Sequence, residues 1–255
     1  MPPSPWPFLD HPGPLAFAHQ GGGFEHPENT MVAFEHAVSL GYRFLETDVQ
    51  VTADGVLVAF HDGNLGRMTD HSGLIADLPW SVVRHALVAG LHPIPLLEDV
   101  LGTWPETRVN IDPKQDAAVE PLIDVIRRTA AVARVCVGAF SDRRVARIRQ
   151  AAGPDLCCSL GPLGVTRLKA ASWGLPAGRL PAACVQVPVA TRGIVVTDAR
   201  LVAAAHQRGM QVHVWTIDDA CEMGRLLDLG VDGIMTGRPT VLKQVLHDRK
   251  MWAGS

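Results

Sequence analysis

Glu46 and Asp48 lie two residues apart in the apolar, β-prone stretch 44-FLETDVQV-51. Side chains alternate between the two faces of a strand, so both carboxylates share a face with Gln50. If the intervening residues pack against helices, the carboxylates point into the fold. Two like charges about 6–7 Å apart out of bulk water are costly unless a cation lies between them. Mg2+ or Ca2+ prefers carboxylate oxygen, so the stretch predicts a metal site. The alternative is a strand edge that faces solvent.

The stretch 108-RVNIDPK-114 aligns Asn110, Asp112 and Lys114 on one strand face. Asp112 brings a third carboxylate to the end of this strand, where it would complete the metal site. Lys114 follows with an ammonium group that could meet a phosphate or another anion. The alternative for Asp112, which precedes a proline, is a turn former.

Two histidines accompany the carboxylates. His19 lies near the end of the run LAFAHQ and faces inward, and His61 follows the apolar run VLVAF. Two inward histidines around carboxylates are typical of a general acid and base, of which one takes a proton from the attacking group and the other protonates the leaving oxygen. The carboxylates and their metal would stabilise charge at a transferring phosphoryl centre.

A late aromatic side chain, Trp215, ends the run QVHVW. It either walls a substrate pocket or fills the interior of the fold. His213 shares its face two residues earlier and is interpreted as a packing residue.

The elements that must position these side chains are short β-rich runs in alternation with helical patterns, which predicts βα units on a parallel sheet. Eight units in about 250 residues are typical of an α/β fold of the (β/α)8 TIM-barrel type, and residues 1–255 are expected to form this single domain. A doubly wound open sheet is the alternative, but no G-x-G-x-x-G turn follows the first run. Thr30 is expected to cap a helix that ends at Gly41. The expected strands span residues 15–20, 44–51, 108–112, 135–140, 156–160, 183–187, 211–216 and 232–236.

Residues 52–79 do not fit a minimal βα unit. They comprise a TADG turn, a short further strand and a polar, glycine-rich passage. Long connections in compact domains are usually functional or disordered. Because this insertion follows the second strand, we expect it over the carboxyl-terminal mouth of the barrel, where TIM-barrel enzymes keep their chemistry.

Composition excludes several classes of function. The 255-residue chain has a formal net charge of −3, which gives no electrostatic basis for binding nucleic acid. It has no apolar run of about 18 residues and no signal-peptide pattern at its start, so we expect a cytoplasmic protein without a transmembrane segment. The five cysteines show no metal-binding spacing, and their odd number argues against a disulfide framework. The pair Cys157-Cys158 is interpreted as strand packing.

Seven stretches in fixed order resemble the glycerophosphodiester phosphodiesterases: AHQGG, PENTMVAFEHAVSLG, ETDVQVTADGVLVAFHD, IPLLEDVL, NIDPK, WTID and GVDGIMTGRP. The resemblance implies a TIM barrel that hydrolyses small-molecule glycerophosphodiesters to glycerol 3-phosphate and an alcohol with a divalent cation. It also implies that His19 and His61 are the acid–base pair. By the same resemblance, Glu46 and Asp48 correspond to metal ligands of the family. Lys114 corresponds to a lysine beside the phosphate, and Trp215 corresponds to an aromatic residue of the substrate pocket.

Four positions depart from the family pattern. Gln20 stands where the family usually has Arg; we expect it to bind substrate by a hydrogen bond, although charge-assisted contacts are roughly twice as strong. Asp112 replaces the third Glu ligand, and its shorter side chain would reach the metal through water. Asp218 replaces Asn, and Gly237 replaces Asp. The acid–base pair and the E-x-D pair are intact, so we expect an active enzyme.

Three other functions are alternatives to this one. A lysophospholipase D would need an apolar groove at the barrel mouth, which the insertion neither demands nor excludes. A weakened barrel that binds a phosphorylated ligand without turnover is suggested by Gln20 and Asp112. An aldolase-type barrel is disfavoured, because no inward lysine lies in mid-strand to form a Schiff base.

Overall fold

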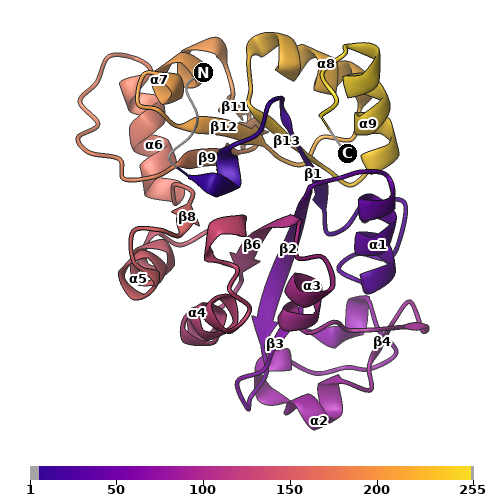
Figure 1. Cartoon of the computed structure of the whole chain (residues 1–255). Helices are drawn as coiled ribbons and strands as arrows, with labels where there is room; N and C mark the ends of the chain where they lie inside the picture. The colour runs from indigo at the N-terminus through magenta and orange to yellow at the C-terminus, as the bar shows by residue number, and fades with distance from the viewer. Residues whose placement is uncertain (1–5, 254–255) are drawn as a thin grey trace.

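A ring of parallel strands forms the centre of the computed structural model, which describes residues 6–253. The hydrogen-bonded order of the eight strands within these residues is β8-β7-β6-β2-β1-β13-β12-β9, and a parallel bridge from Ser159 to Cys184 joins its two ends. The (β/α)8 prediction is confirmed, and the open-sheet alternative is wrong (Figure 1). The ends of the expected domain, residues 1–5 and 254–255, lie outside the described residues. The barrel strands are β1 (Leu15–His19), β2 (Phe44–Val51), β6 (Arg108–Pro113), β7 (Val135–Val137), β8 (Cys157–Cys158), β9 (Cys184–Val187), β12 (Gln211–Val214) and β13 (Gly233–Thr236).

Helices cover the outside of the barrel (Figure 1). Thr30 caps the first of them as predicted, since its Oγ1 accepts a hydrogen bond from the Ala33 N–H at 3.3 Å. Helices α6 (Pro162–Ala171) and α9 (Pro239–Asp248) both begin at a proline, whose fixed φ suits the first helical position. The helices are α1 (Met31–Ser39), α3 (Leu97–Thr103), α4 (Val119–Arg128), α5 (Asp142–Ala152), α6 (Pro162–Ala171), α7 (Ala199–His206), α8 (Ala220–Leu229) and α9 (Pro239–Asp248).

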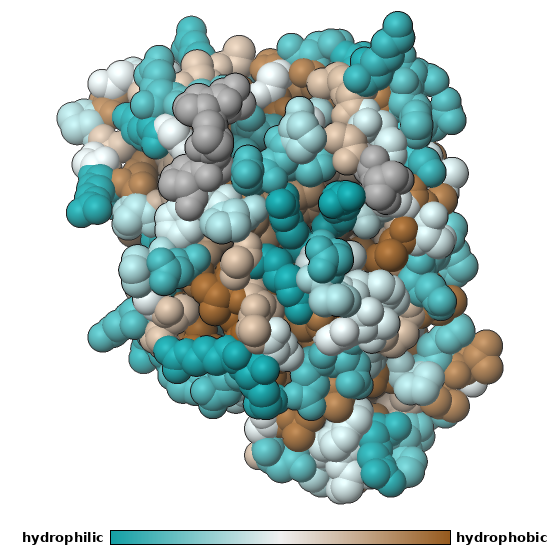
Figure 2. Space-filling model, viewed as in Figure 1, coloured by the Kyte–Doolittle hydropathy of each residue, from teal (hydrophilic) through white to brown (hydrophobic). Residues whose placement is uncertain are grey.

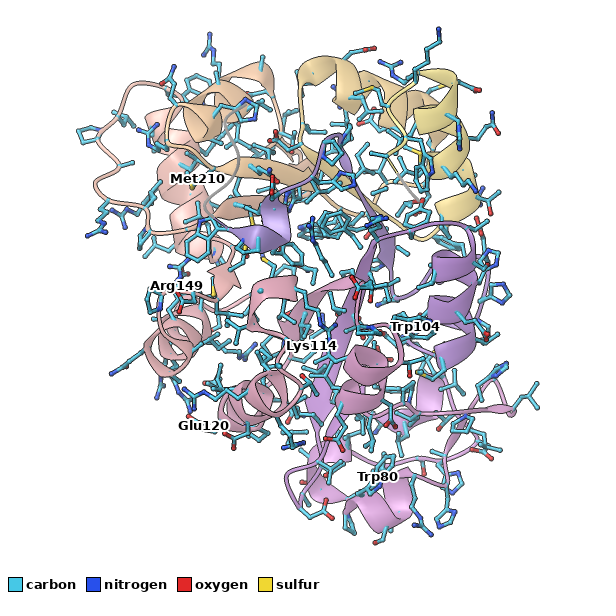
Figure 3. The ribbon with its side chains drawn as sticks, in the orientation of Figure 1. Trp80, Trp104, Lys114, Glu120, Arg149 and Met210 are labelled. Atoms are coloured by element: carbon cyan, nitrogen blue, oxygen red, sulfur yellow. The ribbon has the colours of Figure 1, made fainter. Side chains whose placement is uncertain are left out.

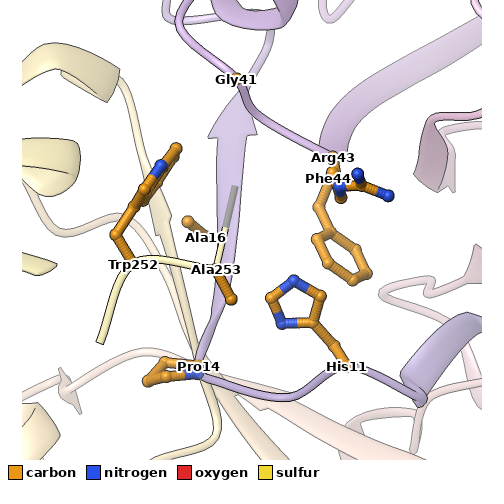
Figure 4. A pocket seen from close by; sticks show the side chains of 8 residues that line it. All are labelled: His11, Pro14, Ala16, Gly41, Arg43, Phe44, Trp252 and Ala253. Atoms are coloured by element: carbon orange, nitrogen blue, oxygen red, sulfur yellow. The ribbon is translucent and has the colours of Figure 1, made fainter. Parts of the chain in front are cut away.

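Apolar side chains pack on both sides of the strands. Leu45, Val49 and Val109 pack outward against the helices. Phe17 and Phe44 pack inward at the amino-terminal end of the barrel. The short 3-10 helix η1 (Pro7–Leu9) covers this end, and the ring centroids of Phe8 and Phe44 lie 5.7 Å apart. A recess of only about 10 Å³ remains nearby (Figure 4), which is room for about one water molecule. The amino-terminal end is therefore filled, and the chemistry must lie at the other end.

The insertion after β2 forms a small unit with its own apolar cluster, which includes Val58, Phe60 and Ile75. The unit is longer than the expected 52–79, because Val88 and Ile94 pack on the same cluster. It lies beside α1 and α3 in Figure 1. Its elements are β3 (Leu57–Ala59), η2 (Leu65–Arg67), η3 (Ile75–Asp77), α2 (Trp80–Val83), β4 (Leu87–Val88) and β5 (His92–Pro93).

Among residues 6–253, none of the helices has the length and hydrophobicity needed to span a membrane. The face drawn in Figure 2 carries mainly hydrophilic side chains, with hydrophobic ones scattered among them.

Candidate active site

The three carboxylates lie on neighbouring strands and point into the barrel. Strands β2 and β6 pair in register, with Glu46 opposite Asn110 and Asp48 opposite Asp112. The exposed fractions are 4% for Glu46, 2% for Asp48 and 8% for Asp112, so the solvent-facing alternative for β2 is wrong. Strand alternation therefore placed all three side chains on the correct face.

Lys114 lies between two of these carboxylates (Figure 3 labels its position). Its Nζ is 2.7 Å from Asp48 Oδ1 and 2.7 Å from Asp112 Oδ2. Burial disfavours the ammonium, but Asp112 and Asp48 outweigh burial and raise the pKa of Lys114. Burial likewise opposes ionisation of Asp48, yet Lys114 and Gln20 lower the pKa of that carboxyl. Lys114 thus remains charged and holds Asp48 in its ionised form.

Gln20 donates hydrogen bonds to two of the carboxylates and does not itself line the cavity. Its Nε2 donates to Asp48 Oδ2 at 2.6 Å, and its backbone N–H donates to Glu46 Oε2 at 3.1 Å. Gln20 has a φ of 55°, in the left-handed region that is strained for a side chain of this size. It is 7% exposed and does not line the cavity described below, so this geometry gives no support to the expected contact with substrate.

Asn29, in the PENT turn formed by residues 27–30, is a second partner of Asp48. Its Nδ2 lies 3.3 Å from Asp48 Oδ2, and its Oδ1 accepts a hydrogen bond from Thr47 Oγ1 at 2.7 Å. Its own φ is 55°. The PENT turn therefore helps to orient a carboxylate as well as starting α1.

The chemistry of the donor set fits a hard divalent cation, although among the described residues the oxygens of these three carboxylates do not all lie within 4.8 Å of one another. All three side chains offer carboxylate oxygen, the ligand that Mg2+ and Ca2+ prefer. Among the described residues, Asp112 Oδ1 is buried without a hydrogen-bond partner. Burial raises the pKa of Glu46 and of Asp112. A cation between these groups would offset the cost of their burial.

The two histidines flank the carboxylates. His19 Nε2 is 3.7 Å from Glu46 Oε2, and burial lowers the pKa of His19. His61 Nδ1 is 2.7 Å from Asp62 Oδ1. Both imidazoles line the same cavity as the three carboxylates.

Arg67 of the insertion braces Asp62. Its Nη2 donates to Asp62 Oδ1 at 3.0 Å and to Glu28 Oε1 at 2.6 Å, and its Nε donates to Asp62 Oδ2. These hydrogen bonds lower the pKa of Asp62 to about 2. No residue spacing pointed to Arg67, because only the loop conformation brings it to Asp62 and Glu28.

A cavity of about 670 Å³ opens at the carboxyl ends of the strands. Seven of the eight predicted site residues line it, namely His19, His61, Glu46, Asp48, Asp112, Lys114 and Trp215. The Trp215 and Phe140 rings meet edge to face with centroids 5.4 Å apart, and Lys114 Nζ lies 5.8 Å from the Phe140 centroid. Trp215 is therefore a pocket wall, and the sequence missed Phe140 as its partner. The rest of the wall is largely apolar and includes Leu160, Val165, Val187, Ile194 and Val196.

Asp218 and Gly237, two of the departures from the family pattern, contact one another. Asp218 Oδ1 accepts hydrogen bonds from Thr236 Oγ1 at 2.9 Å and from the Gly237 N–H at 2.7 Å. A Cβ at Gly237 would come within 2.6 Å of the Phe24 ring. The two departures thus fit one local arrangement at the end of β13.

Comparison with known proteins agrees with this geometry. The model of the glycerophosphoryl diester phosphodiesterase family matches residues 19–241. The chain belongs to this family. The resemblance inferred from the seven stretches is confirmed.

Relatives within the glycerophosphoryl diester phosphodiesterase family match along nearly the whole chain. "Probable glycerophosphodiester phosphodiesterase 2" of Mycobacterium tuberculosis is 41% identical over 97% of this chain and 96% of that protein. Lysophospholipase D GDPD1 of Rattus norvegicus is 27% identical, with 91% of this chain and 85% of that protein covered. A phosphodiesterase of Oleispira antarctica, solved with the product sn-glycerol-3-phosphate, shares the fold: the TM-score is 0.78 at 20% identity, over 92% of this chain and 97% of that one.

Proposed function

We propose that this chain is a metal-dependent phosphoric diester hydrolase that converts glycerophosphodiesters into glycerol 3-phosphate and an alcohol. The observation that carries the proposal is the convergence of His19, His61 and three buried carboxylates on one cavity. The activity in the name of the relative from Mycobacterium tuberculosis supports it.

His19 and His61 act as the acid–base pair. One imidazole takes a proton from the attacking group, and the other protonates the leaving alcohol oxygen. Because Nδ1 of His61 faces Asp62, its Nε2 is the atom that exchanges a proton with substrate.

Glu46, Asp48 and Asp112 would hold the divalent ion, Mg2+ or Ca2+, and the ion would supply positive charge to stabilise the phosphoryl oxygens in the transition state. Lys114 contacts the phosphate from the same wall, and Trp215 with Phe140 bounds the pocket. Gln20 acts as a positioning residue: its amide orients Asp48, in place of the substrate contact expected from the sequence.

Release of glycerol 3-phosphate tests this proposal. Purified protein is incubated with glycerophosphocholine and Mg2+, Ca2+ or Mn2+, and product is measured with and without EDTA. We expect turnover that requires the metal and stops in EDTA. Turnover that continues in EDTA contradicts metal dependence, and no turnover of any diester with any metal favours the non-catalytic phosphate-binding barrel.

A second candidate substrate is a lysophospholipid, processed by the same chemistry. The observation that favours it is the apolar wall of the cavity. At the mouth, strand β10 (Ala190–Thr191) pairs with β11 (Ile194–Val195). The Ile194 and Val195 side chains of β11 are both more than half exposed. In this alternative these side chains contact the acyl chain, and the insertion does not form this wall.

A pair of substitutions separates the two substrates. Ile194→Asp should raise KM for lysophosphatidylcholine and leave glycerophosphocholine turnover unchanged. Leu91→Asp, at an equally exposed apolar side chain of the insertion, is the matched control. Equal effects of Ile194→Asp on both substrates, or no turnover of lysophosphatidylcholine, would exclude the lysophospholipase D activity.

Three further proposals rest on the sequence: a single domain over residues 1–255, a cytoplasmic location, and a small-molecule substrate without nucleic-acid partners.

A further inference from the structure

Three cysteines meet inside the barrel at the end opposite to the candidate active site. Cys136 lies on β7, Cys157 on β8 and Cys184 on β9, and their sulfur atoms all lie within 4.8 Å of one another. The Sγ atoms of Cys136 and Cys184 are 3.9 Å apart. None of the three lines the 670 Å³ cavity, so the catalytic proposal does not use them.

The cluster is sealed from water. The exposed fractions are 0% for Cys136, 2% for Cys157 and 0% for Cys184. The three pack with Phe8, Phe17 and Phe44 in the cluster that fills the amino-terminal end of the barrel. By contrast, Cys158 points to the other face of β8 and packs in the outer layer beneath the helices.

His213 supplies a fourth candidate ligand from the next strand, β12. Its Nε2 is 3.2 Å from Gln211 Oε1, so Nε2 carries the proton and Nδ1 is left with a lone pair. Among the described residues, Nδ1 has no hydrogen-bond partner, although His213 is 0% exposed. A buried nitrogen without a partner is costly, and a neighbouring group with which the His213 side chain interacts is the Cys184 thiol.

The His213 ring lies on the strand next to Cys184, although neither of its nitrogens belongs to the group of described ligand atoms that lie within 4.8 Å of one another. Its Cδ2 edge faces β13, since a Cβ on Gly233 would lie 2.9 Å from Cδ2. Nδ1 is on the opposite edge of the ring, toward β9, the strand that carries Cys184. A metal-bound histidine usually donates its other N–H to a protein oxygen, which is the role that Gln211 fills here.

We propose that Cys136, Cys157 and Cys184 form a structural site for a thiophilic divalent cation of the zinc class, with His213 as the fourth ligand after a shift of its side chain. Three thiolates and one imidazole are an established tetrahedral zinc set, and a Zn–S bond of about 2.3 Å implies S···S separations of about 3.8 Å. The Cys136–Cys184 separation of 3.9 Å is close to that value. Binding of one Zn2+ releases three thiol protons to solvent and oxidises nothing.

The site would link four successive barrel strands through one ion. The sequence showed no metal-binding spacing because each ligand comes from a different strand, and only barrel closure brings them together. A bound ion would stabilise the amino-terminal end of the barrel without contacting substrate.

Metal content of the full-length chain tests the proposal. The protein is unfolded and refolded with zinc, dialysed against EDTA to strip the oxygen-ligand site, and assayed for metal by mass spectrometry. We expect about one zinc per chain to remain, and refolding with Cd2+ to give sulfur-to-metal charge-transfer absorption. Absence of both signals overturns the proposal. A protein mass lower by two hydrogens also overturns it, because that result indicates a disulfide between these thiols.

Adjacent cysteines give a matched pair of variants. Cys157→Ala should lose the zinc and the cadmium absorption, whereas Cys158→Ala, equally buried on the same strand, should keep both. Zinc retained at full stoichiometry by Cys157→Ala contradicts the assignment. His213→Gln provides a second test if Cys157→Ala does not fold: it should reduce zinc retention at least about tenfold, and unchanged retention contradicts the role of His213.

Discussion

His61 and Asp62 are joined by a hydrogen bond of 2.7 Å between Nδ1 and Oδ1, which fixes one nitrogen of a proposed catalytic imidazole. The carboxylate is held in turn by Arg67, which comes from the insertion and also binds Glu28 of the PENT turn. The insertion therefore contributes both His61 and its partner Asp62 to the active site, whereas His19 lies on the barrel strand β1.

Loss of this bracing should lower kcat more than it raises KM. Asp62→Asn leaves His61 in place but removes its charged partner, and we expect a decrease of about tenfold or more in kcat. Arg67→Met should also lower kcat, but by a smaller factor. Steady-state kinetics measure the changes in kcat and KM separately, with Arg84→Met as a control in the same insertion. A pure KM effect would show that Asp62 contacts substrate instead.

The ionisation of Asp62 should depend on Arg67. Hydrogen bonds from Arg67 lower its pKa from 3.8 to about 2 in the folded chain. The ionised carboxyl therefore favours the folded arrangement above about pH 3.8, and this contribution is lost as the pH falls through about 2. Arg67→Met should return the pKa toward 3.8, as measured by NMR titration of the carboxyl carbon. A pKa that stays near 2 in the variant contradicts this assignment.

Gln20 should act on the carboxylates and not on substrate binding. Gln20→Met removes the donor to Asp48 Oδ2 and leaves a buried acceptor less satisfied, which costs about 1–3 kcal/mol. We expect a lower free energy of unfolding and weaker activation by metal, with KM nearly unchanged. Chemical denaturation and metal titration of activity measure these quantities. A change confined to KM would instead indicate that Gln20 contacts the phosphate directly.

Asp112 should contribute to metal affinity. Asp112→Asn keeps the shape of the side chain but removes the charge whose Oδ1 is buried without a partner among the described residues. The metal concentration for half-maximal activity should rise at least about tenfold. Asp116→Asn, on the exposed 3-10 turn that follows β6, is the control. An unchanged metal requirement in Asp112→Asn places the ion on Glu46 and Asp48 alone.

The fold and the orientation of the site could be read from local patterns. Glu46, Asp48 and Asp112 face inward because strand alternation is a property of the strand itself, and Thr30 caps α1 because capping depends on the adjacent turn. The resemblance placed His19 and His61 in the same site.

Contacts set by tertiary structure could not be predicted. The approach of Arg67 to Asp62 depends on how the insertion packs on its own apolar cluster. The turn of the Gln20 amide toward Asp48 depends on a left-handed backbone at Gln20. The meeting of Cys136, Cys157 and Cys184 depends on the stagger of strands in the closed barrel.

The most direct test of the central claim is glycerol 3-phosphate release by His19→Ala and His61→Ala at saturating metal. Each change should lower kcat by about 100-fold or more, and the double variant should fall little further if the imidazoles act as one unit. The exposed His85→Ala variant should match the unaltered protein. Near-normal turnover in either His19→Ala or His61→Ala would contradict the proposed acid–base mechanism.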